Sequence, residues 1–280
     1  MKLQDVDAAP VAWRECVPAR GEHEPAEGTT TEVVLFLHGL GGSRTGWDPQ
    51  LTDLAEAGYH CAAWDMPGYG CSAPAPAPLT FDVLADACAM WMDALGAAAA
   101  HVVGLSLGGM VAQHVALRHP RRVRSLVLMD TSPAFGLDGT TSAESWMAQR
   151  LQPLRDGSTP ADMAPQVLRG IMAPGVSDGV LATAVAAMSR IPTAGLAAAI
   201  ECLVTHDTRA RLREIAAPTL VMVGEHDDET PLAYAAHLAD GIPGSHLEQV
   251  PAAGHISNLE APAAVNHLLR QFLSQLPAAT

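Results

Sequence analysis

Short apolar runs recur along the chain, each bounded by turn-forming residues. Several of them lack the polar alternation of a strand with one wet face, which is typical of parallel strands covered on both faces. The candidate strands are Val33–Leu37, His60–Asp65, His101–Leu105, Ser125–Asp130, Thr219–Val223 and His246–Val250.

Helical patterns separate these runs. Segment 80–96 begins at a capping threonine and ends at a glycine, segment 107–119 stops before Pro120, and segment 261–275 follows the last strand. Alternating strands and helices of this kind predict an α/β fold with a doubly wound, mostly parallel sheet.

The alternation stops between about residue 133 and residue 211. This stretch contains four helix-like pieces separated by Pro and Gly, at 143–154, 160–171, 178–191 and 193–204. Because a crossover between strands is normally short, about eighty residues of helix are too many for one. We interpret them as a helical lid, the alternative being an independent helical domain. The predicted organisation is an α/β core at 1–132, a lid at 133–211 and the rest of the core at 212–280.

Composition and charge argue against several kinds of partner and location. The chain has 16 basic and 30 acidic residues, a net charge of -14, which argues against a nucleic-acid partner because phosphate contacts need clustered Lys and Arg. The 5 cysteines form no CxxC pair and the N-terminal stretch has no apolar signal region, so we expect a cytoplasmic protein with reduced thiols. No apolar stretch is long enough for a membrane span, and no oligomeric state is indicated.

The candidate chemistry begins at the stretch “GLSLG”, where Gly104 and Gly108 flank Ser106. The spacing G-x-S-x-G suits a sharp strand-to-helix turn that exposes the serine hydroxyl above a sheet, since side chains at the glycine positions would collide with neighbouring backbone. The pattern is common, and an ordinary turn is the alternative. A predicted strand before it and a predicted helix after it favour a nucleophile.

A serine nucleophile needs a base, and the base needs an orienting acid. In hydrolases with such a turn, the chain order is serine, acid, histidine. The strand at 219–223 is followed by “GEHDDETP”, which contains Asp227 and Asp228, and the strand at 246–250 is followed by a loop that contains His255. Alone, Asp227 could cap a helix and His255 could be an ordinary loop residue. Their order along the chain, each after a predicted strand, favours the catalytic interpretation.

Acyl transfer also requires two N–H donors for the developing oxyanion. The backbone N–H of Leu107, directly after the serine, is one candidate. The stretch “LFLHGLGGS” after the first predicted strand supplies the other, the N–H of Leu40, since Gly39 allows that loop to turn its amide inward.

The sequence does not support a dinucleotide site or a metal site. The stretch 39–44 lacks the third glycine of a G-x-G-x-x-G dinucleotide fingerprint, although Asp65 lies roughly where a ribose-binding acid would be expected. No histidines are spaced i, i+4 and no Cys/His cluster exists, so the sequence predicts neither a metal nor a cofactor.

Five motifs spread along the chain outside the lid, “HGLGGS”, “DMPGYGCS”, “GLSLGG”, “GEHDDETP” and “AGHISNLEAP”, together resemble those of the α/β-hydrolase fold family. The resemblance implies that Ser106 is the nucleophile and His255 the base. It implies Asp227 as the acid, because the family pattern D-x-x-T/V-P matches the spacing to Thr230. Asp228 and Asp130 remain alternatives for the acid.

Within this family, “WDPQL”, “GLSLGGMVAQ” and “GHISNLEAP” most resemble the 3-oxoadipate enol-lactonases and related carboxylesterases. The chain departs from them in the oxyanion loop, nearer to S-N-S-L-G in those enzymes, and in “DMPGYG”, where they have an arginine-containing turn. A serine at the turn also differs from the aspartate of haloalkane dehalogenases and epoxide hydrolases.

We therefore predict a serine hydrolase that cleaves a carboxylic ester or lactone of a small, largely apolar substrate through an acyl-enzyme. Alternatives are a C–C bond hydrolase or cofactor-free perhydrolase on the same triad and, in another class, a ligand receptor or scaffold of this fold. The arginines of the lid either pair with a substrate carboxylate or face solvent; they are Arg150, Arg155, Arg169 and Arg190.

Overall fold

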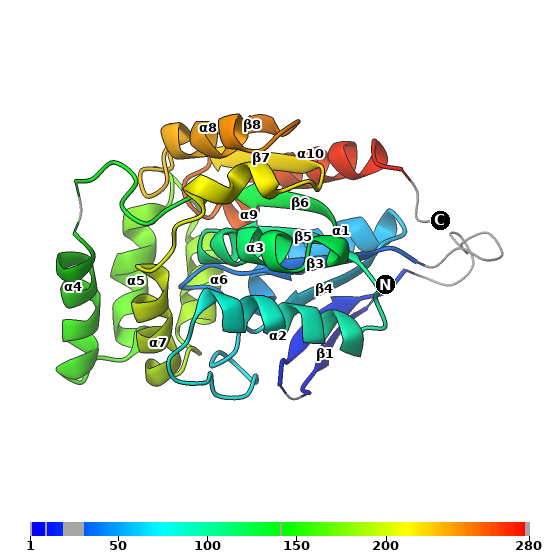
Figure 1. Cartoon of the computed structure of the whole chain (residues 1–280). Helices are drawn as coiled ribbons and strands as arrows, with labels where there is room; N and C mark the ends of the chain where they lie inside the picture. Colours follow the sequence, from blue (N-terminus) through cyan, green and yellow to red (C-terminus); the bar gives the residue numbers. More distant parts are fainter. Residues whose placement is uncertain (1, 9, 19–30, 141, 278–280) are drawn as a thin grey trace.

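An 8-stranded sheet organises the chain, with the strand order β1-β2-β4-β3-β5-β6-β7-β8 (Figure 1). The computed structural model describes residues 2–8, 10–18, 31–140 and 142–277. From β4 to β8 all neighbouring strands are parallel, while β1 pairs antiparallel with β2, and β2 with β4. The strands are β1 (Leu3–Val6), β2 (Trp13–Cys16), β3 (Val33–Leu37), β4 (His60–Trp64), β5 (Ala100–Leu105), β6 (Val123–Met129), β7 (Thr219–Gly224) and β8 (His246–Val250).

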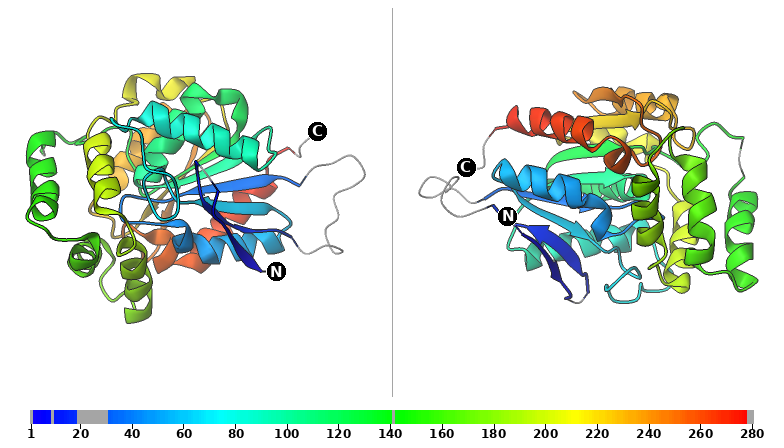
Figure 2. Two further views of the ribbon diagram at one scale, coloured as in Figure 1. Left: turned by 90° about the horizontal axis from the view of Figure 1, so that it is seen from below. Right: turned by 180° about the vertical axis from the view of Figure 1, so that it is seen from behind.

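Helices cover both faces of this sheet. On one face lie α2 (Phe81–Ala94), α3 (Leu107–Arg118) and α8 (Leu232–Gly241). On the other lie α1 (Asp48–Glu56) and α10 (Pro262–Ser274), seen in front of the sheet in the right-hand view of Figure 2.

Strand β3 shows why its sequence has no polar alternation. Val33, Leu35 and Leu37 belong to the hydrophobic cluster beneath α2 and α3. Val34 and Phe36 belong to the cluster beneath α1 and α10. Because successive side chains of a strand point to opposite faces, a strand with helices on both sides must be apolar throughout.

The sequence prediction of a doubly wound, mostly parallel sheet is confirmed, and each of the six predicted strands is present. It missed the antiparallel pair β1 and β2, whose sequences “LQDV” and “WREC” are short and half polar. This pair lies at the edge of the sheet, where solvent reaches the polar positions, so no apolar run marks it.

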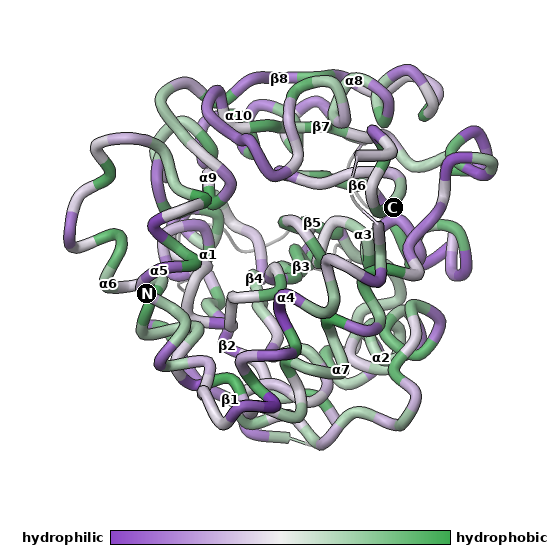
Figure 3. The backbone as a smooth tube through the Cα atoms, turned by 90° about the vertical axis from the view of Figure 1, so that its left-hand side faces the viewer, coloured by the Kyte–Doolittle hydropathy of each residue, from purple (hydrophilic) through white to green (hydrophobic). Residues whose placement is uncertain are grey.

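Four helices lie between β6 and β7 in the chain; we call them the lid helices. They are α4 (Ala143–Arg155), α5 (Pro160–Ile171), α6 (Asp178–Met188) and α7 (Thr193–Leu203). They stand together at one end of the sheet, and Figure 3 views the molecule from that side. Among the described residues no single helix is long and apolar enough to cross a membrane; α6 and α7 reach the threshold only as a pair, bent by 96°.

A pair of histidines joins the chain beyond α7 to helix α3. His114 Nε2 lies 3.2 Å from Nδ1 of the buried His206, whose Nε2 lies 3.0 Å from the carbonyl oxygen of Ser132. Burial lowers the pKa of His206 to about 3 and that of His114 to about 4. Both rings are therefore neutral in the folded protein at pH 5 to 7.

This pair makes the folding stability depend on pH. An unfolded histidine binds a proton near pH 6.5 and folded His206 does so only near pH 3, so between these values the unfolded chain holds more protons and stability falls as the pH falls. Each such histidine removes about 1.4 kcal/mol per pH unit below 6.5. We predict that His206→Gln reduces the loss of unfolding free energy between pH 7.5 and 5.5 by about 1 kcal/mol.

Urea unfolding at the two pH values measures this difference. His237→Gln, on the exposed His237 of α8, is the matched control and should leave the loss unchanged. An equal pH dependence in His206→Gln and in the unsubstituted protein would contradict the prediction.

Candidate active site

Ser106 stands at the turn between β5 and α3. Its backbone has φ 55° and ψ -119°, a conformation that side-chain-bearing residues rarely adopt. Its N–H donates to the Met129 carbonyl at 2.9 Å, and Thr131 Oγ1 donates to its carbonyl at 2.7 Å. These bonds to the neighbouring strand and the loop after it hold the serine in its strained position.

The two glycines of G-x-S-x-G are required by close backbone contacts. A Cβ on Gly104 would overlap the carbonyl of Gly108, and a Cβ on Gly108 would overlap the carbonyl of Leu37 at the end of β3. Helix α3 can therefore begin directly above the sheet only if both positions lack a side chain.

The three residues predicted as a triad lie together. His255 Nε2 is 2.9 Å from Ser106 Oγ, and His255 Nδ1 is 3.0 Å from each carboxylate oxygen of Asp227. His255 is 7% exposed and Asp227 is 4% exposed. When Asp227 is ionised and the ring is neutral, Nδ1 carries the ring proton and Nε2 presents a lone pair to the serine hydroxyl.

Asp227 is held by the residues that follow it. The N–H groups of Glu229 and Thr230 each donate to Oδ1 at 2.9 Å, and Thr230 Oγ1 donates to Oδ2 at 2.8 Å. These bonds explain the D-x-x-T-P spacing: the threonine three residues after the aspartate orients the carboxylate toward the imidazole. Asp228, the adjacent alternative, is exposed.

Asp130, the other alternative for the acid, is fully buried at the end of β6 but faces other partners. Its Oδ1 accepts from Gly224 N at 2.8 Å and its Oδ2 from Ser257 Oγ at 2.6 Å. Burial and the charge of Asp227 raise the pKa of Asp130 to about 7. It therefore lies near the triad and makes no hydrogen bond to the imidazole.

The carboxylates around His255 determine its protonation. Burial lowers the pKa of the imidazole, but the charge and hydrogen bond of Asp227 outweigh burial. The charges of Asp130 and Glu229 add to this, and the pKa of His255 rises to about 9. The arrangement stabilises the imidazolium that forms when the ring accepts a proton.

The predicted oxyanion loop passes directly over the serine. A Cβ on Gly39 would lie 3.0 Å from Ser106 Cβ. The Gly39 carbonyl is engaged by Gly42 N at 3.0 Å and His38 Nδ1 at 2.9 Å. Since the C=O and N–H of a trans peptide point in opposite directions, the Leu40 N–H points away from these partners. In the part of the chain that the structure describes, no acceptor pairs with it.

Two side chains that the sequence analysis did not assign fix this loop. The buried Tyr69 donates its hydroxyl to the Leu40 carbonyl at 2.9 Å, and Nε2 of His38 accepts from Met66 N at 3.1 Å. Leu107, the second predicted donor, is the first residue of α3, where an N–H has no partner within the helix.

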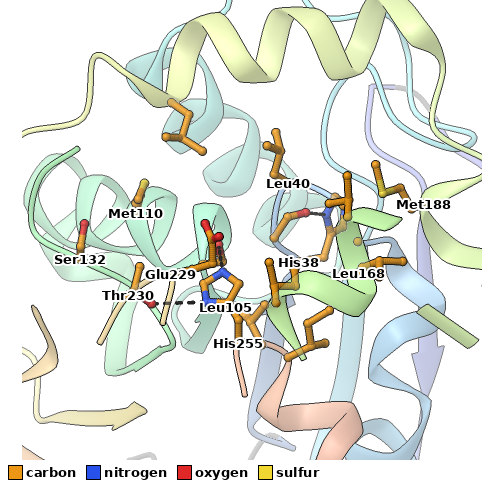
Figure 4. Close-up of a pocket in the computed structure, with 18 of the residues that line it drawn as sticks. His38, Leu40, Leu105, Met110, Ser132, Leu168, Met188, Glu229, Thr230 and His255 are labelled. Atoms are coloured by element: carbon orange, nitrogen blue, oxygen red, sulfur yellow. Dashed lines mark hydrogen bonds between the residues drawn. The ribbon is translucent and has the colours of Figure 1, made fainter. Parts of the chain in front are cut away.

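A cavity of about 570 Å³ lies between the triad and the lid helices. In Figure 4, Met110 and Ser132 lie on one side of His255, and Leu40, Leu168 and Met188 on the other. Ser106 and His255 open into this cavity, and the lid contributes most of its apolar wall. The apolar residues from the lid helices are Trp146, Met163, Val167, Leu168, Ile171, Ala184, Ala187, Met188, Leu196, Ile200 and Leu203.

Among the four arginines singled out in the lid, Arg150 lines the cavity. Its guanidinium lies 3.9 Å from the centre of the Trp146 ring, and burial lowers its pKa. The cavity lining also contains three carboxylates, those of Asp138, Asp228 and Glu229. Arg155, Arg169 and Arg190 are exposed, and Arg190 donates to Thr45 Oγ1.

Asp65, considered as a ribose-binding acid, holds a turn instead. Its carboxylate accepts from Arg44 N at 3.1 Å and from Cys71 N at 3.2 Å. Over the described ranges, no group of three or more His, Cys, Asp and Glu side chains is arranged to hold a metal ion.

Comparison with known proteins agrees with this fold. Residues 32–262 match the alpha/beta hydrolase fold family. The chain is 35% identical over 267 residues to a protein of Variovorax paradoxus assigned as a carbamate hydrolase, covering 91% of this chain and 96% of that protein. It is 34% identical over 229 residues to the pimeloyl-[acyl-carrier protein] methyl ester esterase of Chromobacterium violaceum, covering 79% and 86%.

A solved structure is similar along its whole length. The enol-lactonase of Burkholderia xenovorans superposes with a TM-score of 0.83 at 25% identity, and the match covers 97% of this chain and 100% of that one. The matched family, these relatives and the sheet topology lead to one assignment. The chain belongs to the alpha/beta hydrolase fold family.

Proposed function

We propose that the protein is a serine hydrolase that cleaves a carboxylic ester or lactone through an acyl-enzyme. The observation that carries the proposal is the continuous chain of contacts from Asp227 through His255 to Ser106, at 3.0 Å and 2.9 Å. A serine so connected has a base for its proton and a fixed partner for the resulting imidazolium.

The reaction follows from this geometry. His255 Nε2 takes the proton of Ser106 Oγ as the oxygen attacks the substrate carbonyl, and the oxyanion forms against the N–H groups of Leu40 and Leu107. The C–O bond then breaks, and the leaving alkoxide receives the proton from His255. A water molecule, deprotonated by His255, cleaves the acyl-enzyme and releases the acid. From a lactone the alcohol stays tethered, so the product is one hydroxy acid.

The cavity suggests the size and polarity of the substrate. A volume of about 570 Å³ with apolar walls suits a small acyl group carrying few polar atoms. We assign residues 133–211 as a lid that covers this cavity and sets the substrate range. Two relatives support ester chemistry, the methyl ester esterase at 34% identity and the enol-lactonase structure at 25%.

Replacement of the nucleophile is the first test. We predict that Ser106→Ala lowers kcat by about 10⁴- to 10⁶-fold on a panel of esters, lactones and carbamates of graded acyl length. Ser43→Ala, which alters another serine of the cavity lining, should retain activity within about threefold. Near-normal turnover by Ser106→Ala would refute the proposal. A fluorophosphonate that fails to label Ser106 in a peptide map would also count against an enzyme.

The identity of the acid is the second test. Asp227→Asn should lower kcat by about 10³- to 10⁴-fold, because the imidazole loses the partner that fixes its tautomer. Asp228→Asn, on the exposed neighbour, should leave kcat almost unchanged. Asp130→Asn should cost far less turnover than Asp227→Asn in the fraction that remains folded, since Asp130 does not bond the ring. The assignment is wrong if Asp227→Asn is active while Asp130→Asn or Asp228→Asn is inactive.

The pH dependence of kcat/KM is the third test. Since the pKa of His255 is raised to about 9 and the base must be neutral, kcat/KM should rise with pH through neutrality and level off only in the alkaline range. Glu229→Gln removes a negative charge that raises this pKa, so the acid limb should move to lower pH. Glu201→Gln, on the exposed side of α7, is the control and should leave the limb in place. An acid limb that stays fixed in Glu229→Gln would contradict the assignment of His255.

A further inference from the structure

Glu260 makes an unusual set of contacts at the end of α9 (Ser257–Glu260). Its half-buried carboxylate accepts hydrogen bonds from three backbone N–H groups. Oε2 accepts from Ala173 at 2.7 Å and Gly254 at 3.0 Å, and Oε1 accepts from Ile256 at 2.9 Å. Hydrogen bonds from N–H groups to a carboxylate are stronger than those between neutral partners.

The three donors come from two different parts of the fold. Gly254 and Ile256 are the residues on either side of His255, so the carboxylate holds the histidine loop from both sides. Ala173 belongs to the lid, two residues after the end of α5. The N–H of His255 itself donates to the carbonyl of Ile171, the last residue of α5, at 2.9 Å.

The lid backbone also packs directly against the histidine loop. A Cβ added at Gly254 would lie 2.5 Å from Ala173 N, 2.8 Å from Met172 C and 2.9 Å from Ile171 O. All three nearest atoms belong to the lid backbone. Gly254 therefore allows the two segments to approach closely, and Glu260 bonds to both of them.

A local role at the start of α9 explains only one of the three hydrogen bonds to Glu260. The bond from Ile256 N is a helix-start contact, since Ile256 directly precedes α9. Ala173 lies 87 residues away in sequence, and its N–H shares Oε2 with that of Gly254. One oxygen atom thus joins the lid to the loop that carries the catalytic base.

We propose that Glu260 is a positioning residue that couples the docking of lid residues 171–173 to the orientation of His255. The 2.9 Å contact between His255 Nε2 and Ser106 Oγ then depends on the lid being seated. The inference rests on the proposed function in so far as His255 acts as the base.

Glu260→Gln tests the coupling, because the amide replaces one acceptor oxygen by a donor that cannot receive an N–H. We expect kcat and the rate of fluorophosphonate labelling of Ser106 to fall together, by about 10- to 100-fold, as expected for a small displacement of a catalytic group. Hydrogen exchange at the amides of Ala173, Gly254 and Ile256 should accelerate. The matched control is Glu225→Gln, whose carboxylate accepts from Ala252 N at 2.9 Å in the same loop and is expected to leave both rates unchanged.

Gly254→Ala tests the same contact without altering Glu260 or α9. Its methyl group meets the lid backbone, so it should lower both rates and accelerate exchange at Ala173. Gly170→Ala, one residue before Ile171 and with open space around the added Cβ, is the control. Because the two variants break one contact, the double variant should lose less than the product of the two single losses.

The outcomes separate this inference from the proposed function. Faster exchange at Ala173 in Glu260→Gln with unchanged kcat and labelling would overturn the coupling, since the lid would be loosened without effect on the triad. The coupling would also be overturned if the double variant lost kcat and labelling rate by the product of the two single losses. If Ser106→Ala keeps full turnover, the proposed function fails. In that case hydrogen exchange at the Ile256 amide of Gly254→Ala still tests the coupling. Faster exchange supports the coupling, and an unchanged exchange rate overturns it.

Discussion

The close approach of α3 to the end of β3 is the constraint on which the rest of the site depends. Backbone atoms of Gly108 and Leu37 meet where any side chain would overlap, and this contact forces the turn that leaves Ser106 at φ 55°. The strain is maintained because bonds to Met129 and Thr131 hold the serine from the adjoining strand and loop. With α3 seated in this way, its unpaired N-terminal amide and the loop after β3 come to the same place.

The parallel sheet brings together the remaining groups. Strands β3, β5, β6, β7 and β8 end at one edge, so the loops that carry Leu40, Ser106, Asp130, Asp227 and His255 all open there. The hydrogen-bond partners of the two buried carboxylates, Asp227 and Asp130, then determine which of them faces the imidazole. Thr230 turns Asp227 toward the imidazole, while Gly224 and Ser257 hold Asp130 in another direction. Asp130 therefore makes no hydrogen bond to the imidazole, although it holds the same loop at Ser257.

The sequence indicated those features that depend on a residue type at a fixed local position. Apolar runs indicated the six strands buried on both faces, and the spacing to Thr230 indicated which aspartate meets His255. The edge pair β1 and β2 was not predictable from such a signal, because each strand is only four residues long and its two central positions are polar and at least partly exposed. Tyr69 and Glu260 were missed for a different reason. Tyr69 bonds to the backbone of Leu40 and Glu260 to that of Ala173, 87 residues away, and no sequence pattern reveals such contacts between separate segments.

The contacts between the lid and the histidine loop involve main-chain atoms on the lid side. Ile171 contributes a carbonyl and Ala173 an N–H, and neither contact uses a lid side chain. Substitutions in α5 to α7 that reshape the apolar wall can therefore accumulate without altering these two contacts to the His255 loop, provided the backbone path at 171–173 is kept. This separation makes the scaffold evolvable: the shape of the cavity can change with the side chains of the lid while the contacts of His255 with Asp227 and Ser106 stay intact.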